Sequence, residues 1–153
     1  MKKLQSLLNQ LEAHIPNYEK RNETISQSNV GWQLAHSLLV IDVICTSLKN
    51  SNPKEYKWRF NKNRFLVLTI LKKIPRGVGK APKVVQPYEE INSAQLKKQL
   101  ELLRNKITEF ESFSTKNYFK HPYFGDLHLK DTLYFLELHT KHHLKIIEDI
   151  LTK

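Results

Sequence analysis

Apolar residues recur every three or four positions over most of the chain, the spacing that places them on one face of an α-helix. Helix boundaries follow from Ser and Asn residues that can cap a helix and from prolines that favour its first turn. The five predicted helices span residues 2–14, a stretch from a Ser28 or Asn29 cap to about residue 49, a stretch from Pro53 to about residue 73, a stretch from a Ser93 cap through Phe110, and about 129–152.

Three polar or Gly- and Pro-containing stretches separate these helices and are predicted to be loops. They are residues 15–27, 74–92 and 114–128. The low glycine content, four residues in 153, and the long periodic stretches predict an all-α protein. Four long helices and a short first one predict a four-helix bundle with a short extra N-terminal helix, folded as a single domain over residues 1–153.

The composition is typical of a globular protein in a reducing compartment. Hydrophobic residues make up 40% of the chain, which argues against disorder, and Cys45 is the only cysteine. The longest apolar run, Leu38 to Cys45, is interrupted by Asp42 and is far shorter than the ~20 residues that cross a bilayer. Gln5 and Asn9 break the apolar character of the N-terminus, so we expect a cytoplasmic protein with no membrane partner.

Basic residues outnumber acidic ones by 25 to 15, which gives a net charge of +10. A basic surface attracts anionic partners such as nucleic acid, an acidic lipid surface or a negatively charged substrate. The best candidate patch surrounds Trp58, because an aromatic ring among cations can stack on single-stranded bases. Its cations are Lys54, Lys57 and Arg59. One hypothesis is therefore a non-catalytic protein that binds nucleic acid or another anion, with structural histidines.

The last predicted helix places two histidines near its apolar face. Each residue advances the helix by about 100°, so His143 falls near the middle of the apolar stripe and His139 about 40° to one side. His142 lies about 100° away, which predicts a solvent-facing side chain or a dimer contact. Two imidazoles one turn apart can bind one metal ion, whereas two structural histidines would each need a buried polar partner.

The second predicted helix offers a third ligand. It is apolar nearly all round, and His36 lies on the side that also holds Trp32 and Ala35. A histidine in such surroundings is desolvated and neutral, the form that binds metals. The alternative is a core histidine bonded to a backbone carbonyl group.

The stretch Val-Gly-Trp-Gln-Leu-Ala-His at residues 30–36, followed by His-x-x-His-His at 139–143, resembles the DinB-like superfamily. This superfamily includes YfiT-type metal-dependent hydrolases and thiol transferases. The loops at residues 76–83 and 121–125 resemble an uncharacterised branch of it.

The resemblance implies a four-helix bundle with a three-histidine site for a divalent metal, zinc or nickel. The matching positions are His36, His139 and His143. It also implies that the chain forms a homodimer and acts on a small molecule whose identity it does not specify. The resemblance also places the loop that contains His121 near the metal pocket. There His121 either packs in the loop or contacts the ligands or the substrate.

Three neutral imidazoles leave a divalent metal with its full charge and an open position, so hydrolysis and thiol transfer are both compatible with the ligands. The choice of a general base stays open. The candidates by position are Asp42, Tyr123, Asp126 and Glu137. A nucleophilic role for Cys45 is not expected, because burial in an apolar helix raises the pKa of a thiol.

Overall fold

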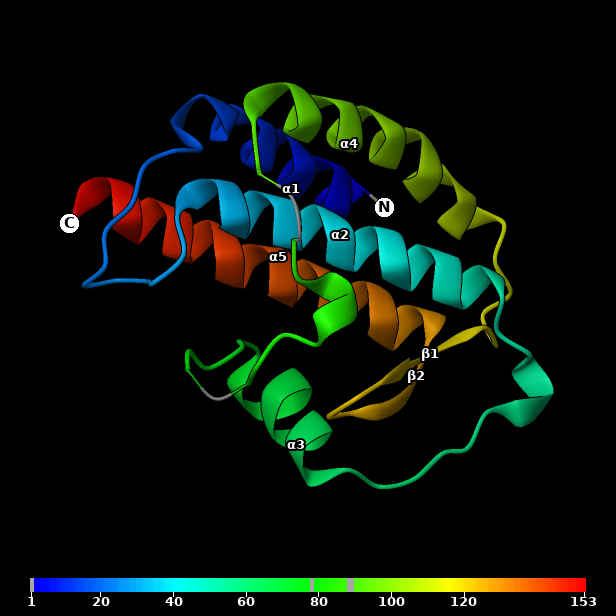
Figure 1. The fold of residues 1–153 in the computed structure, drawn as a ribbon. Coiled ribbons are helices and arrows are strands. Elements are labelled where there is room, and N and C mark those ends of the chain that lie inside the picture. The colour runs from blue at the N-terminus through cyan, green and yellow to red at the C-terminus, as the bar shows by residue number, and fades with distance from the viewer. Residues whose placement is uncertain (1, 78, 88–89) are drawn as a thin grey trace.

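The computed structural model describes residues 2–77, 79–87 and 90–153, and four of its helices pack as a bundle (Figure 1). The helix α2 contacts α5 and α4, and α1 contacts the same two helices, so the bundle is closed on all four sides. The bundle helices are α1 (Lys2–Ala13), α2 (Val30–Lys49), α4 (Ser93–Lys106) and α5 (Leu129–Thr152). The first helix is therefore one of the four bundle helices, which corrects the prediction that it is an extra element.

Leucine and isoleucine stripes on all four helices form one core. The helix α2 is apolar nearly all round because α4, α5 and the 3-10 turns Ile15–Asn17 and Lys83–Val85 contact it. The side chain of Asn29 caps it by accepting a hydrogen bond from the Trp32 backbone N–H at 2.9 Å. This is the one described helix whose length and composition would suit a membrane span, and 67% of that stretch is buried in the bundle. Its apolar character is explained by its central position.

The third predicted helix is interrupted in its first half. Pro53 opens only one 3-10 turn, Pro53–Glu55, residues 56–61 have no regular structure, and helix resumes at α3 (Lys62–Arg64), which continues as a π-helix, Phe65–Leu71. The backbone N–H of Lys57 donates to the Asp126 carboxylate at 3.0 Å, a contact 69 residues away in sequence that holds the chain out of a helix.

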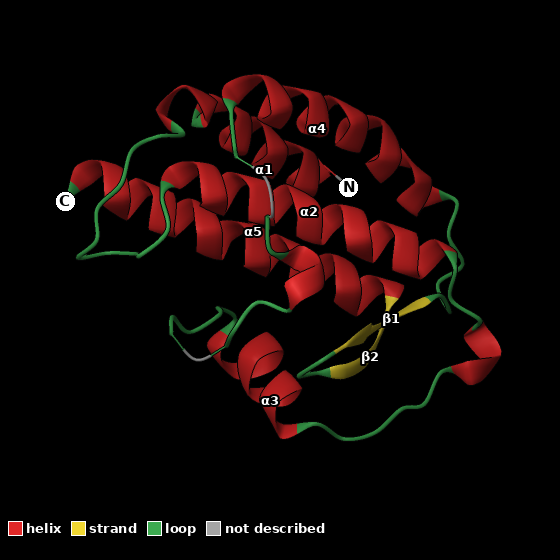
Figure 2. Ribbon diagram, in the orientation of Figure 1, coloured by secondary structure: helices red, strands yellow, loops and turns green. Residues whose placement is uncertain are grey.

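The predicted loop at residues 114–128 contains a β-hairpin, so the protein is mainly helical rather than all-α (Figure 2). The strands are β1 (Tyr118–His121) and β2 (Gly125–His128), and they pair antiparallel with Tyr118 opposite His128. Gly125 has a φ of 70°, which is easily adopted only by glycine and closes the turn.

The fourth predicted helix is also shorter than expected. Asn92, not Ser93, caps α4, because its side chain and that of Gln95 form a reciprocal capping box. The α-helix ends at Lys106 and a 3-10 helix, Ile107–Glu111, continues it. The fifth helix has the predicted bounds.

The loop at residues 74–92 is confirmed where the structure describes it; residues 78 and 88–89 lie outside the described part. It contains one 3-10 turn, Lys83–Val85, which packs on α2 (Figure 1). Val85 is buried there, and its carbonyl group faces the bundle interior. The loop thereby supplies part of the site described below.

Replacement of Gly31 by alanine is expected to lower the free energy of unfolding by about 1–3 kcal/mol. A Cβ atom at Gly31 would lie 2.9 Å from the backbone oxygen of Tyr18, which cannot move away easily because it also accepts the Gly31 N–H at 2.7 Å. Gly79→Ala is the control, since its Cβ would have only a Tyr123 ring atom at 3.9 Å. Urea unfolding midpoints measure both, and equal stabilities would contradict this packing.

Candidate metal centre

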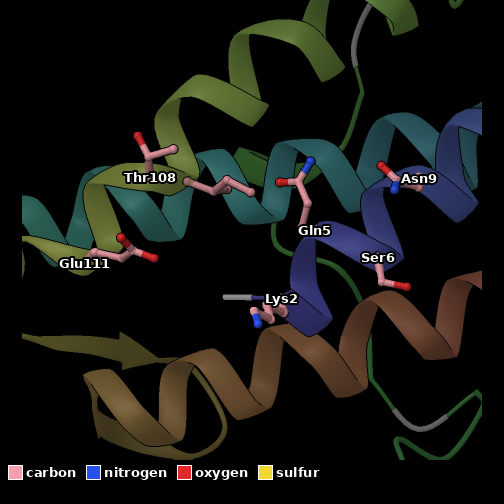
Figure 3. A pocket seen from close by; sticks show the side chains of 7 residues that line it. Lys2, Gln5, Ser6, Asn9, Thr108 and Glu111 are labelled. Atoms are coloured by element: carbon pink, nitrogen blue, oxygen red, sulfur yellow. The ribbon is translucent and has the colours of Figure 1, made fainter.

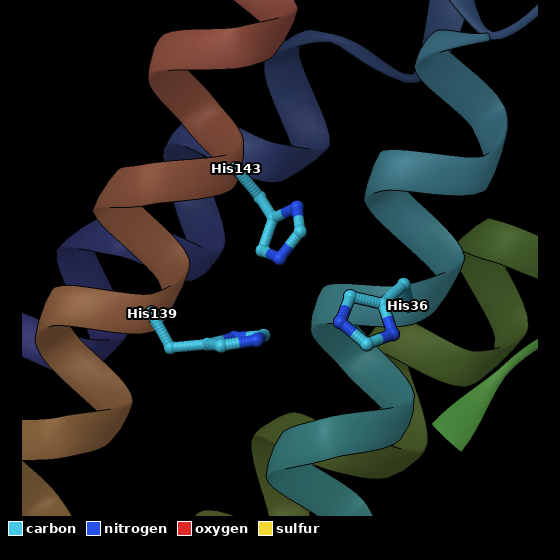
Figure 4. Close-up of side chains that lie close together, drawn as sticks. All are labelled: His36, His139 and His143. Carbon is cyan, nitrogen blue, oxygen red and sulfur yellow. The ribbon is translucent and has the colours of Figure 1, made fainter. Parts of the chain in front are cut away.

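Three histidines from two neighbouring helices meet inside the bundle (Figure 4). His36 comes from α2, and His139 and His143 come from consecutive turns of α5. One potential ligand atom from each residue lies within 4.8 Å of those from the other two. The ring centroids are 4.5 Å apart for His139 and His143, 4.7 Å for His36 and His143, and 5.1 Å for His36 and His139.

The helical positions of these histidines agree with the sequence prediction. His36 is 3% exposed and His143 is 7% exposed. His139 is half-buried as a residue, but its Nδ1 atom is fully enclosed. The cluster thus lies in the interior, where an unpaired polar atom is costly.

The ring of His36 is held by the loop that crosses α2. Its Nδ1 lies 2.7 Å from the carbonyl oxygen of Val85. A carbonyl oxygen only accepts, so Nδ1 carries the proton and Nε2 keeps its lone pair. Trp32 stacks on the other side of the ring, with centroids 4.8 Å apart and planes 13° from parallel. These contacts fix both the orientation and the tautomer of His36.

The ring of His143 is held in the same way by a side chain of α2. Its Nδ1 donates to Gln33 Oε1 at 2.6 Å, and Gln33 Nε2 donates to Ser26 Oγ at 3.2 Å. The second bond orients the amide so that its oxygen faces His143. Metal-binding histidines commonly donate their other N–H group to such an acceptor, which leaves Nε2 free for the metal.

His139 has an unsatisfied atom. Its Nδ1 is buried and has no hydrogen-bond partner among the described residues. Its ring lies beside Phe135 at a centroid distance of 5.5 Å, so an apolar neighbour occupies one side. A buried nitrogen without a partner, beside two imidazoles with free lone pairs, is the arrangement that a bound cation would satisfy.

All three imidazoles are neutral at pH 7. Burial lowers the pKa of His36, despite the opposing bond to Val85. Burial also lowers the pKa of His139 and His143 well below the usual value, and repulsion from the neighbouring histidines lowers both further. Proton binding to one ring disfavours it on the next, whereas one divalent cation can use all three lone pairs.

Two further histidines lie close to the cluster and have other roles. His121 Nδ1 accepts the backbone N–H groups of Tyr123 and Phe124 at 3.1 and 3.2 Å, and its ring stacks on Phe124. It packs the hairpin turn. His142, predicted to face solvent or a partner, is half-buried and contacts the His143 ring edge-on with centroids 5.1 Å apart.

The four candidate general bases make other contacts. Asp42 pairs with Lys106 at 2.6 Å, and Glu137 lies 3.9 Å from Lys3. Asp126 accepts the Lys57 backbone N–H, and the Tyr123 hydroxyl donates to the Lys80 carbonyl at 3.3 Å. None of these bonds reaches the three histidines.

Cys45 is also unsuited to catalysis, because burial raises the pKa of its thiol to about 11.

A pocket of about 450 Å³ lies along α5; none of the three cluster histidines lines it, but His142, which contacts the His143 ring, does. Leu138 and His142, which precede the two cluster histidines of α5 in sequence, form part of its wall. Its remaining lining residues are mostly basic and come from residues 72–76 and from α5: Lys72, Lys73, Ile74, Pro75, Arg76, Lys141 and Lys145.

A second pocket, of about 400 Å³, is lined by residues of α1 and of the turn after α4, such as Gln5, Asn9 and Thr108 (Figure 3). It includes no histidine.

Comparison with known proteins finds no matching family model, no matching curated protein and no matching solved structure. The structure itself shows a mainly helical chain. In it, His36, His139 and His143 form a buried cluster which could hold a metal ion.

Gln33 is a site residue that the sequence reading missed. Its signal was a polar side chain in an apolar helix, since Gln33 is 3% exposed. We expect Gln33→Leu to lower zinc affinity about 10- to 100-fold, because His143 would lose the acceptor that orients it. Ser37→Ala is the control, since this buried hydroxyl bonds only the Gln33 carbonyl oxygen. Isothermal titration measures both, and equal affinities would contradict the role of Gln33.

Proposed function

We propose that the protein is a divalent-metal-binding protein of the DinB-like type, with His36, His139 and His143 as the metal ligands. The observation that carries the proposal is the pattern of hydrogen bonds in the cluster. Two rings donate Nδ1–H to oxygen acceptors, and the third has a buried nitrogen without a partner. His128 also has a buried Nδ1 without a partner, but it lies outside the cluster, whereas the ring of His139 lies against two further imidazoles that could share one cation with it.

The donor set fits zinc or nickel. Imidazole nitrogen is a ligand that both ions accept, and three neutral rings supply no negative charge to offset that of the cation. When bound, such an ion supplies Lewis acidity, which lowers the pKa of a coordinated water or thiol. Metal-dependent hydrolysis and thiol transfer are the two reaction classes that this site would serve.

The chain's own residues would position the ion and restrict access to it. Val85 and Gln33 orient two of the ligands, and Trp32 covers one face of His36. The basic pocket beside α5 is lined by His142, whose ring contacts that of His143, so we assign it as the substrate's approach. The substrate is a small molecule, and the base that would activate it is not assigned.

The DinB-like assignment rests on the placement of the ligands. One histidine lies on the second helix of the bundle and two lie one turn apart on the last, as the resemblance implies. The expected homodimer is part of the same proposal. It predicts a sedimentation mass of twice 18.1 kDa at micromolar concentration.

Elemental analysis tests the proposal. Protein produced without an affinity histidine tag, incubated with zinc or nickel and then desalted, should retain about one ion per chain. The matched variant His36→Ala should retain much less than one, because it removes a ligand without altering the α5 pair. Failure of the unaltered protein to take up either ion would overturn the proposal.

A further inference from the structure

Large apolar side chains gather on the exterior of the segment from residue 54 to residue 73. Trp58 and Phe60 are 67% and 64% exposed. Soluble proteins usually scatter such residues singly, and a gathering of them marks an interaction site. Six of the nine exposed large hydrophobic residues among those described lie here: Trp58, Phe60, Phe65, Leu66, Ile70 and Leu71.

The same segment is strongly basic. Seven cations and one acid, Glu55, give these 20 residues a charge of 7 − 1 = +6, out of +10 for the chain. Within the described residues, none of the seven has an ion-pair partner within 4 Å, so their charge is not neutralised locally. The cations are Lys54, Lys57, Arg59, Lys62, Arg64, Lys72 and Lys73. We call the exposed side of this segment, with these cations and the six apolar residues, the basic apolar surface; within it the rings of Phe60 and Phe65 lie 6.2 Å apart between centroids.

The backbone of this surface is held in place from behind. Asn61 Nδ2 donates to the Tyr123 carbonyl at 3.0 Å, and Arg64 Nη1 donates to the Asp126 carbonyl at 3.1 Å, so the hairpin anchors the segment. Val67 and Leu68 are buried and attach the π-helix to the core. Figure 1 shows α3 beside the hairpin at the margin of the bundle, where no element of the described residues covers its outer face.

We propose that the basic apolar surface docks the protein on an anionic phospholipid bilayer. The aromatic and aliphatic side chains would enter the interface between headgroups and acyl chains, and the surrounding cations would contact the anionic headgroups. This proposal departs from the expectation of no membrane partner, which rested on the lack of a long apolar run at the sequence level; surface docking requires no spanning segment.

Two other occupants fit the surface less well. A second copy of this chain that docked here through the same segment would place two segments of charge +6 against each other. Single-stranded nucleic acid would match the charge and could stack on Trp58 and Phe60, but Leu66, Ile70 and Leu71 have no flat ring on which a base could stack. Lipid uses both the aliphatic and the aromatic members.

Cosedimentation with vesicles tests the proposal. The full chain should bind vesicles of equal parts phosphatidylglycerol and phosphatidylcholine, and this binding should weaken as salt rises. Its affinity for vesicles of pure phosphatidylcholine should be at least tenfold lower. Binding should shift the tryptophan emission to the blue, since Trp58 is exposed. Trp58→Phe should remove the shift and keep affinity within about threefold, because the other tryptophan, Trp32, is half-buried and stacked on His36.

Paired variants separate this surface from general basicity. Lys72→Gln with Lys73→Gln should lower vesicle affinity about 25-fold, at about fivefold per cation. Lys97→Gln with Lys98→Gln removes an equally exposed pair from α4 and should change affinity less than threefold. Ile70→Ala tests an apolar residue of the surface. Leu102→Ala is its control, because Leu102 is an exposed apolar residue elsewhere.

Four results would overturn the proposal. The first is an equal loss of vesicle affinity in both lysine pairs. The second is the absence of a blue shift in protein that binds anionic vesicles. The third is tight oligonucleotide binding without vesicle binding, which would assign the surface to nucleic acid. The fourth is a mass of twice 18.1 kDa with Trp58 already shielded in the absence of lipid, which would assign it to a second copy.

Discussion

Replacement of His143 by alanine is expected to lower the affinity for zinc by more than about 100-fold. The variant loses one of three ligands, and it also leaves Gln33 Oε1 buried without its donor. Loss of an orienting contact alone typically costs 10- to 100-fold in affinity, so loss of the ligand itself should cost more. Competition with a zinc indicator at pH 7.5 measures the change. His36→Ala and His139→Ala should behave alike.

His142→Ala is the matched control, because His142 is adjacent in sequence and contacts the His143 ring but lies outside the cluster. It should change zinc affinity less than threefold. If His142→Ala and His143→Ala lose affinity equally, the assignment of ligands on α5 is wrong.

Zinc is expected to stabilise the folded chain at neutral pH. A ligand present at 100 times its Kd and bound only by the native state adds about 2.7 kcal/mol to the free energy of unfolding. For a chain of 153 residues this corresponds to a rise in Tm of about 5–10 °C. The bundle should also fold without metal, since its core is apolar and continuous. A thermal melt of chelator-treated protein at pH 7.5 that zinc does not change would contradict a native metal site.

Acid should remove the stabilisation of the folded chain by zinc, and it should also destabilise the metal-free protein. Burial lowers the pKa of His121 to about 4, below its usual 6.5, so between these values the unfolded chain binds more protons than the folded one. The contribution of neutral His121 to the free energy of unfolding is complete above pH 6.5. It is lost as pH falls toward 4, an effect of about 3 kcal/mol. The lowered pKa values of His36, His139 and His143 act in the same direction.

Urea midpoints at pH 7.5 and pH 5, with and without zinc, measure both effects. We expect a lower midpoint at pH 5 and no zinc effect there, because protons compete for the imidazole nitrogens. A midpoint that is the same at both pH values would contradict burial of neutral histidines.

The sequence predicted the helices whose apolar stripe is continuous and failed where distant contacts decide the backbone. The stretches at residues 2–14 and 129–152 bury regular leucine and isoleucine patterns, so their bounds are close to α1 and α5. After Pro53, in contrast, the chain is extended because Asp126 holds the Lys57 N–H, a contact between residues far apart that no local pattern indicates. The hairpin that provides Asp126 was itself predicted as a loop.

The same difference applies to the candidate site. The helical positions of His36, His139 and His143 could be calculated from residue spacing, and the structure brings them together. The groups that orient them lie 49 and 110 residues away in sequence, at Val85 and Gln33. Val85 acts through its carbonyl group, so its side chain gave no chemical signal.

X-ray absorption spectroscopy of the zinc-loaded protein tests the central claim most directly. We predict three imidazole nitrogens at ~2.0–2.1 Å from the zinc ion, with one or more oxygen donors completing the shell. No sulfur donor is expected, since Cys45 lies outside the cluster. In His143→Ala the imidazole count should fall by one or the zinc should be lost. A shell with a sulfur donor, or with fewer than three imidazoles in the unaltered chain, would contradict a metal centre at His36, His139 and His143.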